Sequence, residues 1–177
     1  LQAQWGEAQG LIEDAPREAD WPVLVDMVRE HEGDAAAEIA EHWFYRQPGG
    51  VRVYRDAEGE PAGFMLTLAL EETDADARAA DPVVEAAWTH LEAHAPLRPD
   101  ERASMFRFWM ARDTYQAVSP VQSLVFIRQV RHYLQTPNLA YTFLVCRDPD
   151  TWGPLFAYAD MERLPDGDVT VDPHTYT

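Results

Sequence analysis

Two histidines spaced four residues apart, His90 and His94, are the clearest pair of metal-ligating side chains in this 177-residue sequence. On a helix, this spacing places both imidazoles on one face, as a zinc site requires. The string "HLEAH" has neither of the usual zinc-protease orders, and the sequence identifies no third ligand. We therefore interpret the pair as part of a solvated helix face and predict no metal site.

Cys146 is the only cysteine, and it lies in the apolar run "LAYTFLVC". A thiol becomes a good nucleophile when a neighbouring base or positive charge favours the thiolate, and the sequence shows no base for this one. A single cysteine also cannot close an internal disulfide, which excludes a disulfide-stapled secreted fold. We predict a buried structural thiol and a cytoplasmic protein.

Acidic side chains dominate the charge, since 31 Asp and Glu against 14 Lys and Arg give a formal charge of −17. This balance repels a phosphate backbone, so we predict no nucleic-acid partner. The acidic runs "REHEGD" and "EETDAD" could attract a cationic amine, but such runs are more often solvated faces or linkers. No apolar run approaches the roughly 18 to 20 residues that span a bilayer, so we predict no membrane partner. All the basic residues are arginine, which together with the abundant alanine suggests a GC-rich bacterial genome or adaptation to salt.

The elements that would position these side chains begin with a helical region and a hairpin. Apolar and acidic positions alternate at helical spacing over residues 19–46, where Gly33 divides two helices and Asp20 is expected as the first N-cap. The strings "VRVYR" and "AGFMLTLAL" flank the turn "DAEGEP" and predict a β-hairpin. An acidic linker is expected over residues 71–81.

The second half of the sequence predicts alternating helices and strands. Asp81 and Pro82 should open one helix, and Ser119 with Pro120 should open another. The strings "ASMFRFWMA" and "LAYTFLVC" predict strands that precede and follow that second helix. A short helix in "DTWGPLFAYADM" and a last strand in "DVTVD" complete the order.

This order of elements resembles the GNAT (acyl-CoA N-acyltransferase) fold over residues 20–171, with "GLIED" near Leu11 as the first strand. The resemblance implies an α/β (α+β) domain with a mixed, mostly antiparallel sheet flanked by helices. The helix over residues 81–94 is additional to the minimal family plan and lies between the third and fourth strands. We expect one such domain over residues 1–177, either complete or part of a longer protein.

In the family, a glycine-rich turn after the fourth strand opens a helix whose N–H groups hold the CoA pyrophosphate. The family pattern is Arg or Gln, two residues, Gly, one residue, then Gly or Ala. In the nearest register, Gln116 takes the first position, Ser119 that of the first glycine and Val121 that of the second. The resemblance implies that the amides from Ser119 to Gln122 hold phosphate, although both glycines are replaced and Pro120 has no N–H.

The resemblance also implies how an acetyl-CoA or other acyl-CoA would react. The strand backbone near Met110 and Ala111 would orient the pantetheine arm. The general base for an attacking amine would be Glu71 or Glu72 at the end of the hairpin, or Asp113 just after the fourth strand.

The helix after the fifth strand departs from the family at a second chemically important place. Leu155 in "WGPLFAYADM" fits the family leucine, and Phe156 stands where the family tyrosine often protonates the departing thiolate. Phenylalanine cannot donate a proton. Tyr158 is about 200° further around the helix and would face nearly the opposite side.

Three interpretations stay open at this stage. The first is an acyltransferase that acts on an unidentified small-molecule or peptide amine. The second is a catalytically degenerate GNAT-like domain that serves as a binding or regulatory module, alone, as a homodimer or beside neighbouring domains. The third is an unrelated α+β ligand-binding domain, which a sheet without splay between the strands "FRFWMA" and "LAYTFLVC" would favour.

Overall fold

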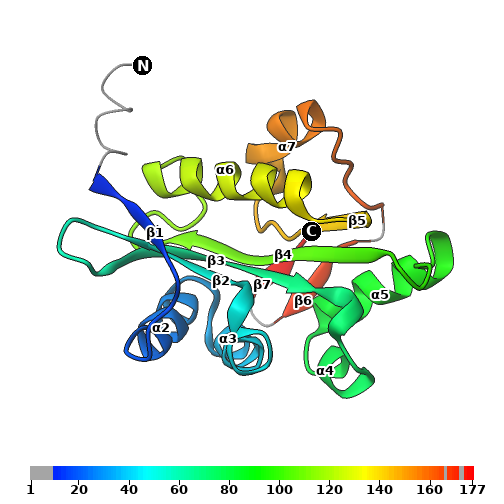
Figure 1. The fold of residues 1–177 in the computed structure, drawn as a ribbon, viewed down its shortest axis with the longest axis horizontal. Helices are drawn as coiled ribbons and strands as arrows, with labels where there is room; N and C mark the ends of the chain where they lie inside the picture. The colour runs from blue at the N-terminus through cyan, green and yellow to red at the C-terminus, as the bar shows by residue number, and fades with distance from the viewer. Residues whose placement is uncertain (1–9, 166, 172–173) are drawn as a thin grey trace.

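A five-stranded sheet forms the middle layer of the protein (Figure 1). The computed structural model describes residues 10–165, 167–171 and 174–177. In spatial order, the strands are β1 (Ile12–Asp14), β2 (Val51–Arg55), β3 (Pro61–Ala69), β4 (Arg102–Ala111) and β5 (Leu139–Leu144). All neighbours are antiparallel except β4 and β5, which are parallel. The predicted mixed, mostly antiparallel sheet is confirmed.

Helices cover both faces of this sheet (Figure 1). One face carries α2 (Asp20–Glu32) and α3 (Asp34–Arg46), which meet at Gly33, a residue with a φ of 93° that favours glycine. The other face carries α6 (Pro120–Gln135) and α7 (Pro149–Tyr158). Between β3 and β4 the chain forms α5 (Pro82–His94), the predicted additional helix. The expected acidic linker is in fact ordered as a 3-10 turn, η3 (Leu70–Glu72), and the short α4 (Ala75–Ala79).

Alternating side chains of β4 divide the interior into two hydrophobic clusters. Met105, Phe108 and Met110 contribute to the cluster under α2, α3 and α5. Phe106 and Trp109 contribute to the cluster under α6 and α7. Because both faces of β4 are buried, this central strand is apolar along most of its length.

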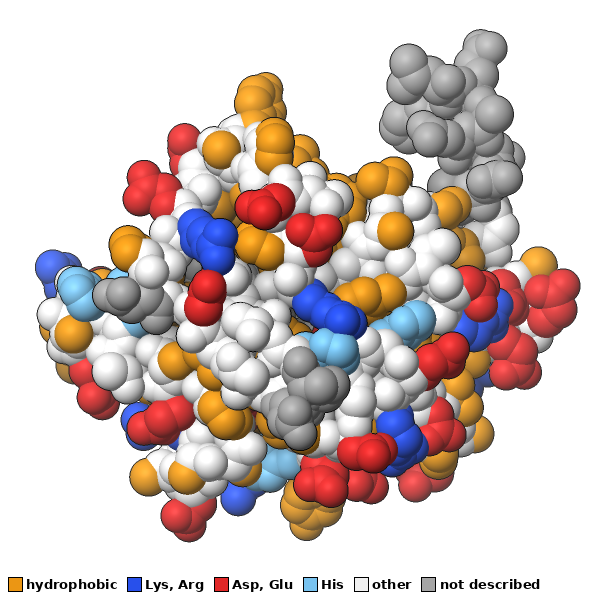
Figure 2. Space-filling model, turned by 180° about the vertical axis from the view of Figure 1, so that it is seen from behind, with side chains coloured by type: hydrophobic (Ala, Val, Ile, Leu, Met, Phe, Trp, Pro, Cys, Tyr) orange, Lys and Arg blue, Asp and Glu red, His pale blue; other side chains and the backbone are white. Residues whose placement is uncertain are grey.

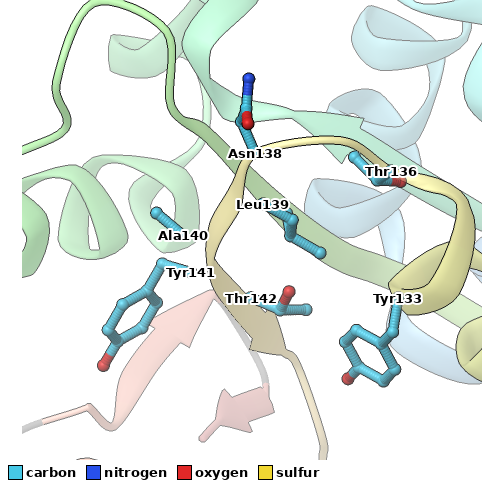
Figure 3. Close-up of a pocket in the computed structure, with 7 residues that line it drawn as sticks. All are labelled: Tyr133, Thr136, Asn138, Leu139, Ala140, Tyr141 and Thr142. Atoms are coloured by element: carbon cyan, nitrogen blue, oxygen red, sulfur yellow. The ribbon is translucent and has the colours of Figure 1, made fainter.

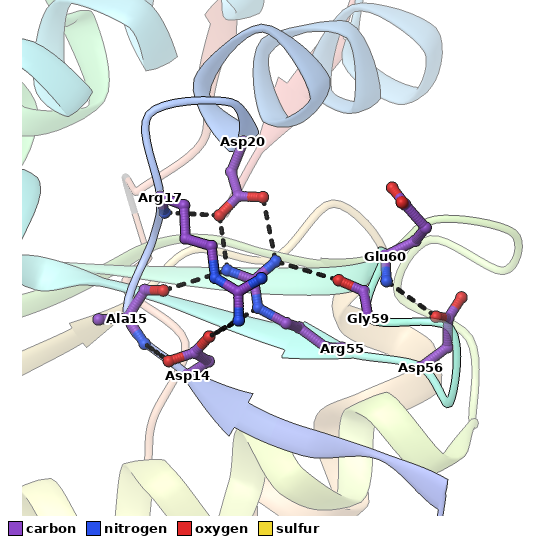
Figure 4. A network of polar contacts seen from close by, with 8 residues as sticks. All are labelled: Asp14, Ala15, Arg17, Asp20, Arg55, Asp56, Gly59 and Glu60. Carbon is purple, nitrogen blue, oxygen red and sulfur yellow. Dashed lines mark hydrogen bonds and ion pairs between the residues drawn. The ribbon is translucent and has the colours of Figure 1, made fainter.

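A buried arginine anchors the start of the chain to the hairpin (Figure 4). Arg55 on β2 donates from Nη2 to Asp20 Oδ2 at 2.7 Å and from Nε to Asp14 Oδ2 at 2.7 Å. The hydrogen bond from Arg55 is the main reason why the pKa of Asp20 is lowered. The expected N-cap role of Asp20 is wrong, because Ala19 occupies the cap and the Asp20 carboxylate binds Arg55 instead.

Strand β4 extends well beyond its pairing with β5. The parallel register runs from Arg102 opposite Leu139 to Phe106 opposite Leu144. The β3–β4 ladder shifts at the same place, so that Arg107 is an extra residue in a bulge. A bulge bends and twists its strand, which explains why β4 leaves β5 here.

The C-terminal end of the chain adds a hairpin where the sequence predicted one strand. Strands β6 (Val169–Val171) and β7 (His174–Tyr176) pair with each other. Beyond β7, Thr177 exchanges two backbone hydrogen bonds with Cys146, which places the hairpin beside the chain that follows β5. In the described part of the chain, no helix combines the length and apolarity needed to cross a membrane.

Candidate functional site

The gap between β4 and β5 is bridged by one carboxamide. The last backbone bond between the strands runs from Val145 N to Phe106 O at 3.1 Å. Farther along, Gln116 donates from Nε2 to Trp109 O at 3.4 Å and accepts from Arg147 N at 3.2 Å. The strands therefore diverge as the resemblance predicts, and a glutamine side chain satisfies one backbone group on each side.

Aromatic rings line this gap on the side of α6 and α7. The indole of Trp109 donates to Val145 O at 2.7 Å, and that of Trp152 donates to Gln116 O at 3.0 Å. Phe156 stacks on Trp152 with ring centroids 6.4 Å apart, whereas Tyr158 is 90% exposed. The prediction that Tyr158 faces away from Phe156 agrees with this placement.

Cys146 lies beside the same gap and is buried, as predicted. Its Sγ is 3.9 Å from Gln116 Oε1. Burial raises the pKa of this thiol to about 11, so the thiolate is scarce at neutral pH.

The start of α6 lies over β3. Ser119 is the N-cap, as predicted, and its Oγ accepts from Gln122 N at 3.3 Å. Ser123 N bonds to Ser119 O. Val121 packs against Gly63 on β3, where an added Cβ would come within 2.6 Å of Val121 Cγ1. The β-branched residue in place of a family glycine therefore fills space over β3.

The structure brings the six predicted cofactor-binding residues together at this end of β4. Most of their side chains are buried rather than open to a ligand, and the backbone of Ala111 is paired on both N–H and C=O with Tyr115. The six residues are Met110, Ala111, Gln116, Ser119, Val121 and Gln122.

A buried carboxylate lies where α2 meets the loop after β4. Glu32, which is 1% exposed, accepts hydrogen bonds from the hydroxyls of Tyr115 and Tyr176. Burial is the main cause that raises the pKa of Glu32, and the charge of Arg107 partly opposes it. Tyr115 has a φ of 54°, a left-handed conformation that is uncommon for non-glycine residues and often marks functional loops.

Arg147 and His31 enclose Tyr115 from two sides. The Arg147 guanidinium lies 5.7 Å from the centre of the Tyr115 ring and donates from Nη1 to His31 O at 2.7 Å. The His31 ring stacks on Tyr115 with centroids 5.2 Å apart. Since Arg147 N also bonds Gln116, the group formed by His31, Tyr115 and Arg147 borders the gap between the strands.

A fully buried ion pair lies beside Tyr176, one of the two tyrosines that bond Glu32. Arg107 donates from Nε to Asp81 Oδ2 at 2.8 Å, and both side chains are 0% exposed. The same carboxylate accepts from Trp43 Nε1 at 2.8 Å and caps α5 through Val83 N at 3.0 Å. The Arg107 guanidinium lies 5.2 Å from the centre of the Tyr176 ring, which connects the pair to Glu32.

Sequence reasoning missed Glu32, Tyr115 and Tyr176. Glu32 belongs to "REHEGD", which we interpreted as a solvated face, so that interpretation is wrong for this residue. Its one local signal is the adjoining Gly33, which ends the helix and turns the chain inward. No sequence signal indicates that the two tyrosines contact Glu32, because Tyr115 is 83 positions and Tyr176 is 144 positions away from it along the chain.

The three carboxylates proposed as bases lie at opposite ends of β4. Glu71 accepts from Ala103 N at 3.1 Å, near the start of the strand. Met110 is seven residues farther on, about 23 Å at the rise of an extended strand. Glu72 shares the exposed turn of Glu71, whereas Asp113 follows the end of β4, is 78% exposed and pairs with Arg112. The structure places Asp113 beside the predicted cofactor residues and Glu71 and Glu72 away from them.

Two shallow hollows of the surface lie elsewhere, at the start of β5. One of about 450 Å³ is lined by Tyr133, Thr136 and residues 138–142 (Figure 3). The nearby His90 ring bonds the Tyr141 hydroxyl at 3.1 Å, so this histidine packs on β5 instead of lying on a solvated face. Within the described residues, no group of three His, Cys, Asp or Glu side chains could hold a metal ion.

Acidic side chains are spread over the face of the molecule seen in Figure 2. There they form several separate groups, with arginines between them. This face therefore has no single acidic patch that would by itself select a cationic substrate.

Comparisons with known proteins establish the fold. No family model matches the sequence, and no curated protein matches it. A solved structure described as histone acetyltransferase HPA2 and related acetyltransferase from Corynebacterium glutamicum is similar, with 14% identity, a TM-score of 0.54 and coverage of 94% of each chain. A GNAT-family acetyltransferase from Listeria monocytogenes is similar at 11% identity, with a TM-score of 0.51 and coverage of 94% of this chain and 92% of that one. The predicted GNAT fold is confirmed.

Proposed function

We propose that the protein is an acyltransferase that moves an acetyl or longer acyl group from acyl-CoA to a small-molecule or peptide amine. The observation that carries this proposal is the gap beyond Phe106, where Trp109 O and Arg147 N each bond the carboxamide of Gln116. The pantetheine arm of CoA contains amides with the same kinds of donor and acceptor. An acyl-CoA amide could therefore replace the glutamine once that side chain turns away.

The residues present fit the acyl-pantetheine arm better than the pyrophosphate. Strand-edge groups and the rings of Trp109 and Trp152 suit an amide-bearing apolar chain. At the start of α6, Pro120 has no N–H and Gln122 N already donates to Ser119 Oγ, which leaves the N–H groups of Ser119 and Val121 to face phosphate. We propose that Met110 and Ala111 flank the arm. Bound acyl-CoA would supply the thioester carbonyl that the amine attacks.

We propose that Tyr115 and Glu32 together accept the proton that the substrate ammonium must lose. An amine attacks only in its neutral form, so an ammonium substrate must first lose a proton. The half-buried Tyr115 hydroxyl can take that proton while it passes its own to Glu32 Oε1. A carboxylate whose pKa is raised by burial is a better base near neutral pH than an ordinary one. Asp113 stays a candidate for proton release to solvent.

Calorimetry and a thiol-release assay with acetyl-CoA, longer acyl-CoAs and a panel of amines test this function. We expect binding by the wild type, and turnover that falls by about 100-fold or more in Glu32→Gln while acyl-CoA binding persists. Glu71→Gln is the matched control, because it makes the same change at the far end of β4. Equal losses of turnover in the two variants would show that Glu32 has no specific role in the reaction.

Two results would overturn the proposal. Absence of binding for every acyl-CoA at millimolar concentration would refute it entirely. Binding without turnover for any amine would instead favour the binding or regulatory module.

A further inference from the structure

Three arginines converge on one carboxylate between the sheet and α6. Arg128 Nη1 lies 3.4 Å from Glu13 Oε1, Arg52 Nε lies 3.9 Å from the same oxygen, and Arg131 Nη1 lies 3.9 Å from Glu13 Oε2. Three positive charges against one negative charge leave a local excess of two, in a chain whose formal charge is −17. We call these four side chains the arginine cluster.

Strand and helix periodicity place the arginine cluster on one surface. Arg52 and Tyr54 are two residues apart on β2 and point to the same face, and Glu13 on β1 is registered opposite Tyr54. Arg128 and Arg131 are three residues apart on α6 and therefore adjacent on the helix. None of the 16 residues of α6 is Asp or Glu, so no acid on the helix neutralises them.

Hydrogen-bond donors around the arginine cluster are left unused. Within the described residues, the side chains of Arg128 and Arg131 make ion pairs with Glu13 but no hydrogen bond. The hydroxyl of Tyr54, a residue that is 0% exposed, has no partner among the described residues either. Tyr54 is registered opposite Glu13 and lies two residues from Arg52 on the same face of β2, so its side chain lies beside the cluster.

The arginine cluster is open to ligands. The arginine side chains are between 27% and 48% exposed, so an anion can reach them without unfolding the protein. Arg128 lies eight residues beyond Pro120, about 12 Å along the helix axis, and β1 and β2 are on the opposite side of β3 from β4. The cluster is therefore separate from the gap between β4 and β5.

From these contacts we infer that the arginine cluster is a binding site for a doubly charged phosphate group. Guanidinium forks match the geometry of phosphate oxygens, and a dianion would neutralise the excess charge of two. Glu13 competes for the same guanidinium groups, so removing its charge should strengthen phosphate binding. The inference is independent of acyl transfer.

Thermal unfolding with increasing inorganic phosphate tests the site, with chloride at equal ionic strength as the reference. We expect a saturable rise in Tm for the wild type and at least a tenfold weaker response for Arg128→Gln/Arg131→Gln, because two charge-assisted contacts are lost. Arg29→Gln/Arg98→Gln is the matched control, since it changes the net charge equally at two exposed arginines outside the cluster. Its response should equal that of the wild type.

Glu13→Gln supplies a readout that a purely structural cluster would not produce. This variant should bind phosphate several-fold more tightly, whatever its stability without ligand. O-phosphoserine in place of inorganic phosphate identifies the source, because tighter binding of the monoester points to a phosphorylated molecule and weaker binding to free phosphate. The inference is overturned if phosphate gives no saturable shift, if the two double variants respond alike, or if Glu13→Gln abolishes the response.

Discussion

Removal of the charge of Asp81 should destabilise the protein far more than the same change at another helix cap. In Asp81→Asn, the side chain keeps its size and can still cap α5 through Val83 N. The guanidinium of Arg107, however, which is 0% exposed, then loses the carboxylate with which it pairs. Breaking a buried ion pair from one side costs about 3 to 5 kcal/mol, because the remaining charge is uncompensated.

Asp148→Asn is the control for this comparison. Asp148 caps α7 through Thr151 N, and asparagine is about as good an N-cap as aspartate. Among the described residues, no buried cation faces Asp148, so we expect a change within about 0.5 kcal/mol. Urea unfolding at neutral pH measures both free energies, and for a chain of this length the difference corresponds to a fall of roughly 6 to 20 °C in Tm.

The double variant Asp81→Asn/Arg107→Met separates the charge from the other contacts. It should recover at least half of the loss caused by Asp81→Asn, because no unpaired charge remains buried. Our reasoning is refuted if Asp81→Asn lies within about 1 kcal/mol of Asp148→Asn. It is also refuted if the double variant is less stable than Asp81→Asn alone, since the main cost would then arise elsewhere.

Three further predictions concern stability and reactivity. Because the pKa of Glu32 is raised above its ordinary 4.5, the folded state holds this proton more tightly than the unfolded state does, and the free energy of unfolding should fall as pH rises through that raised pKa. Urea unfolding at a series of pH values from about pH 4 to about pH 8 measures this fall, and the Glu32→Gln variant should not show it. Gly63→Ala should destabilise by about 1 to 3 kcal/mol, since its Cβ meets Met110 O at 2.6 Å, whereas Gly153→Ala, with open space around it, should stabilise α7 by about 0.5 to 1 kcal/mol in the same assay. Cys146 should react with iodoacetamide about 100-fold more slowly in the folded than in the unfolded protein, and an equal rate would contradict its burial.

Local signals in the sequence were sufficient for most of the elements. Asp81 and Ser119 were predicted as N-caps and are N-caps, since a cap depends on residues within one turn. Asp20 has the same local preference and yet binds Arg55, because a guanidinium 35 residues away offers two hydrogen bonds to its carboxylate. The predicted hairpin and the helix pair around Gly33 likewise rest on neighbouring residues.

The sequence by itself therefore determined most of the order of helices and strands, the acidic character and the resemblance to the GNAT fold, but not α4 or the second strand of the C-terminal hairpin. Only the tertiary structure decided that Glu32 is buried under two tyrosines, that Gln116 bridges the gap after Phe106, and that three arginines meet at Glu13. The physical reason is the range of the interactions involved. Caps and periodic patterns act within a few residues, whereas burial and charge pairing depend on which surfaces meet after the chain has folded.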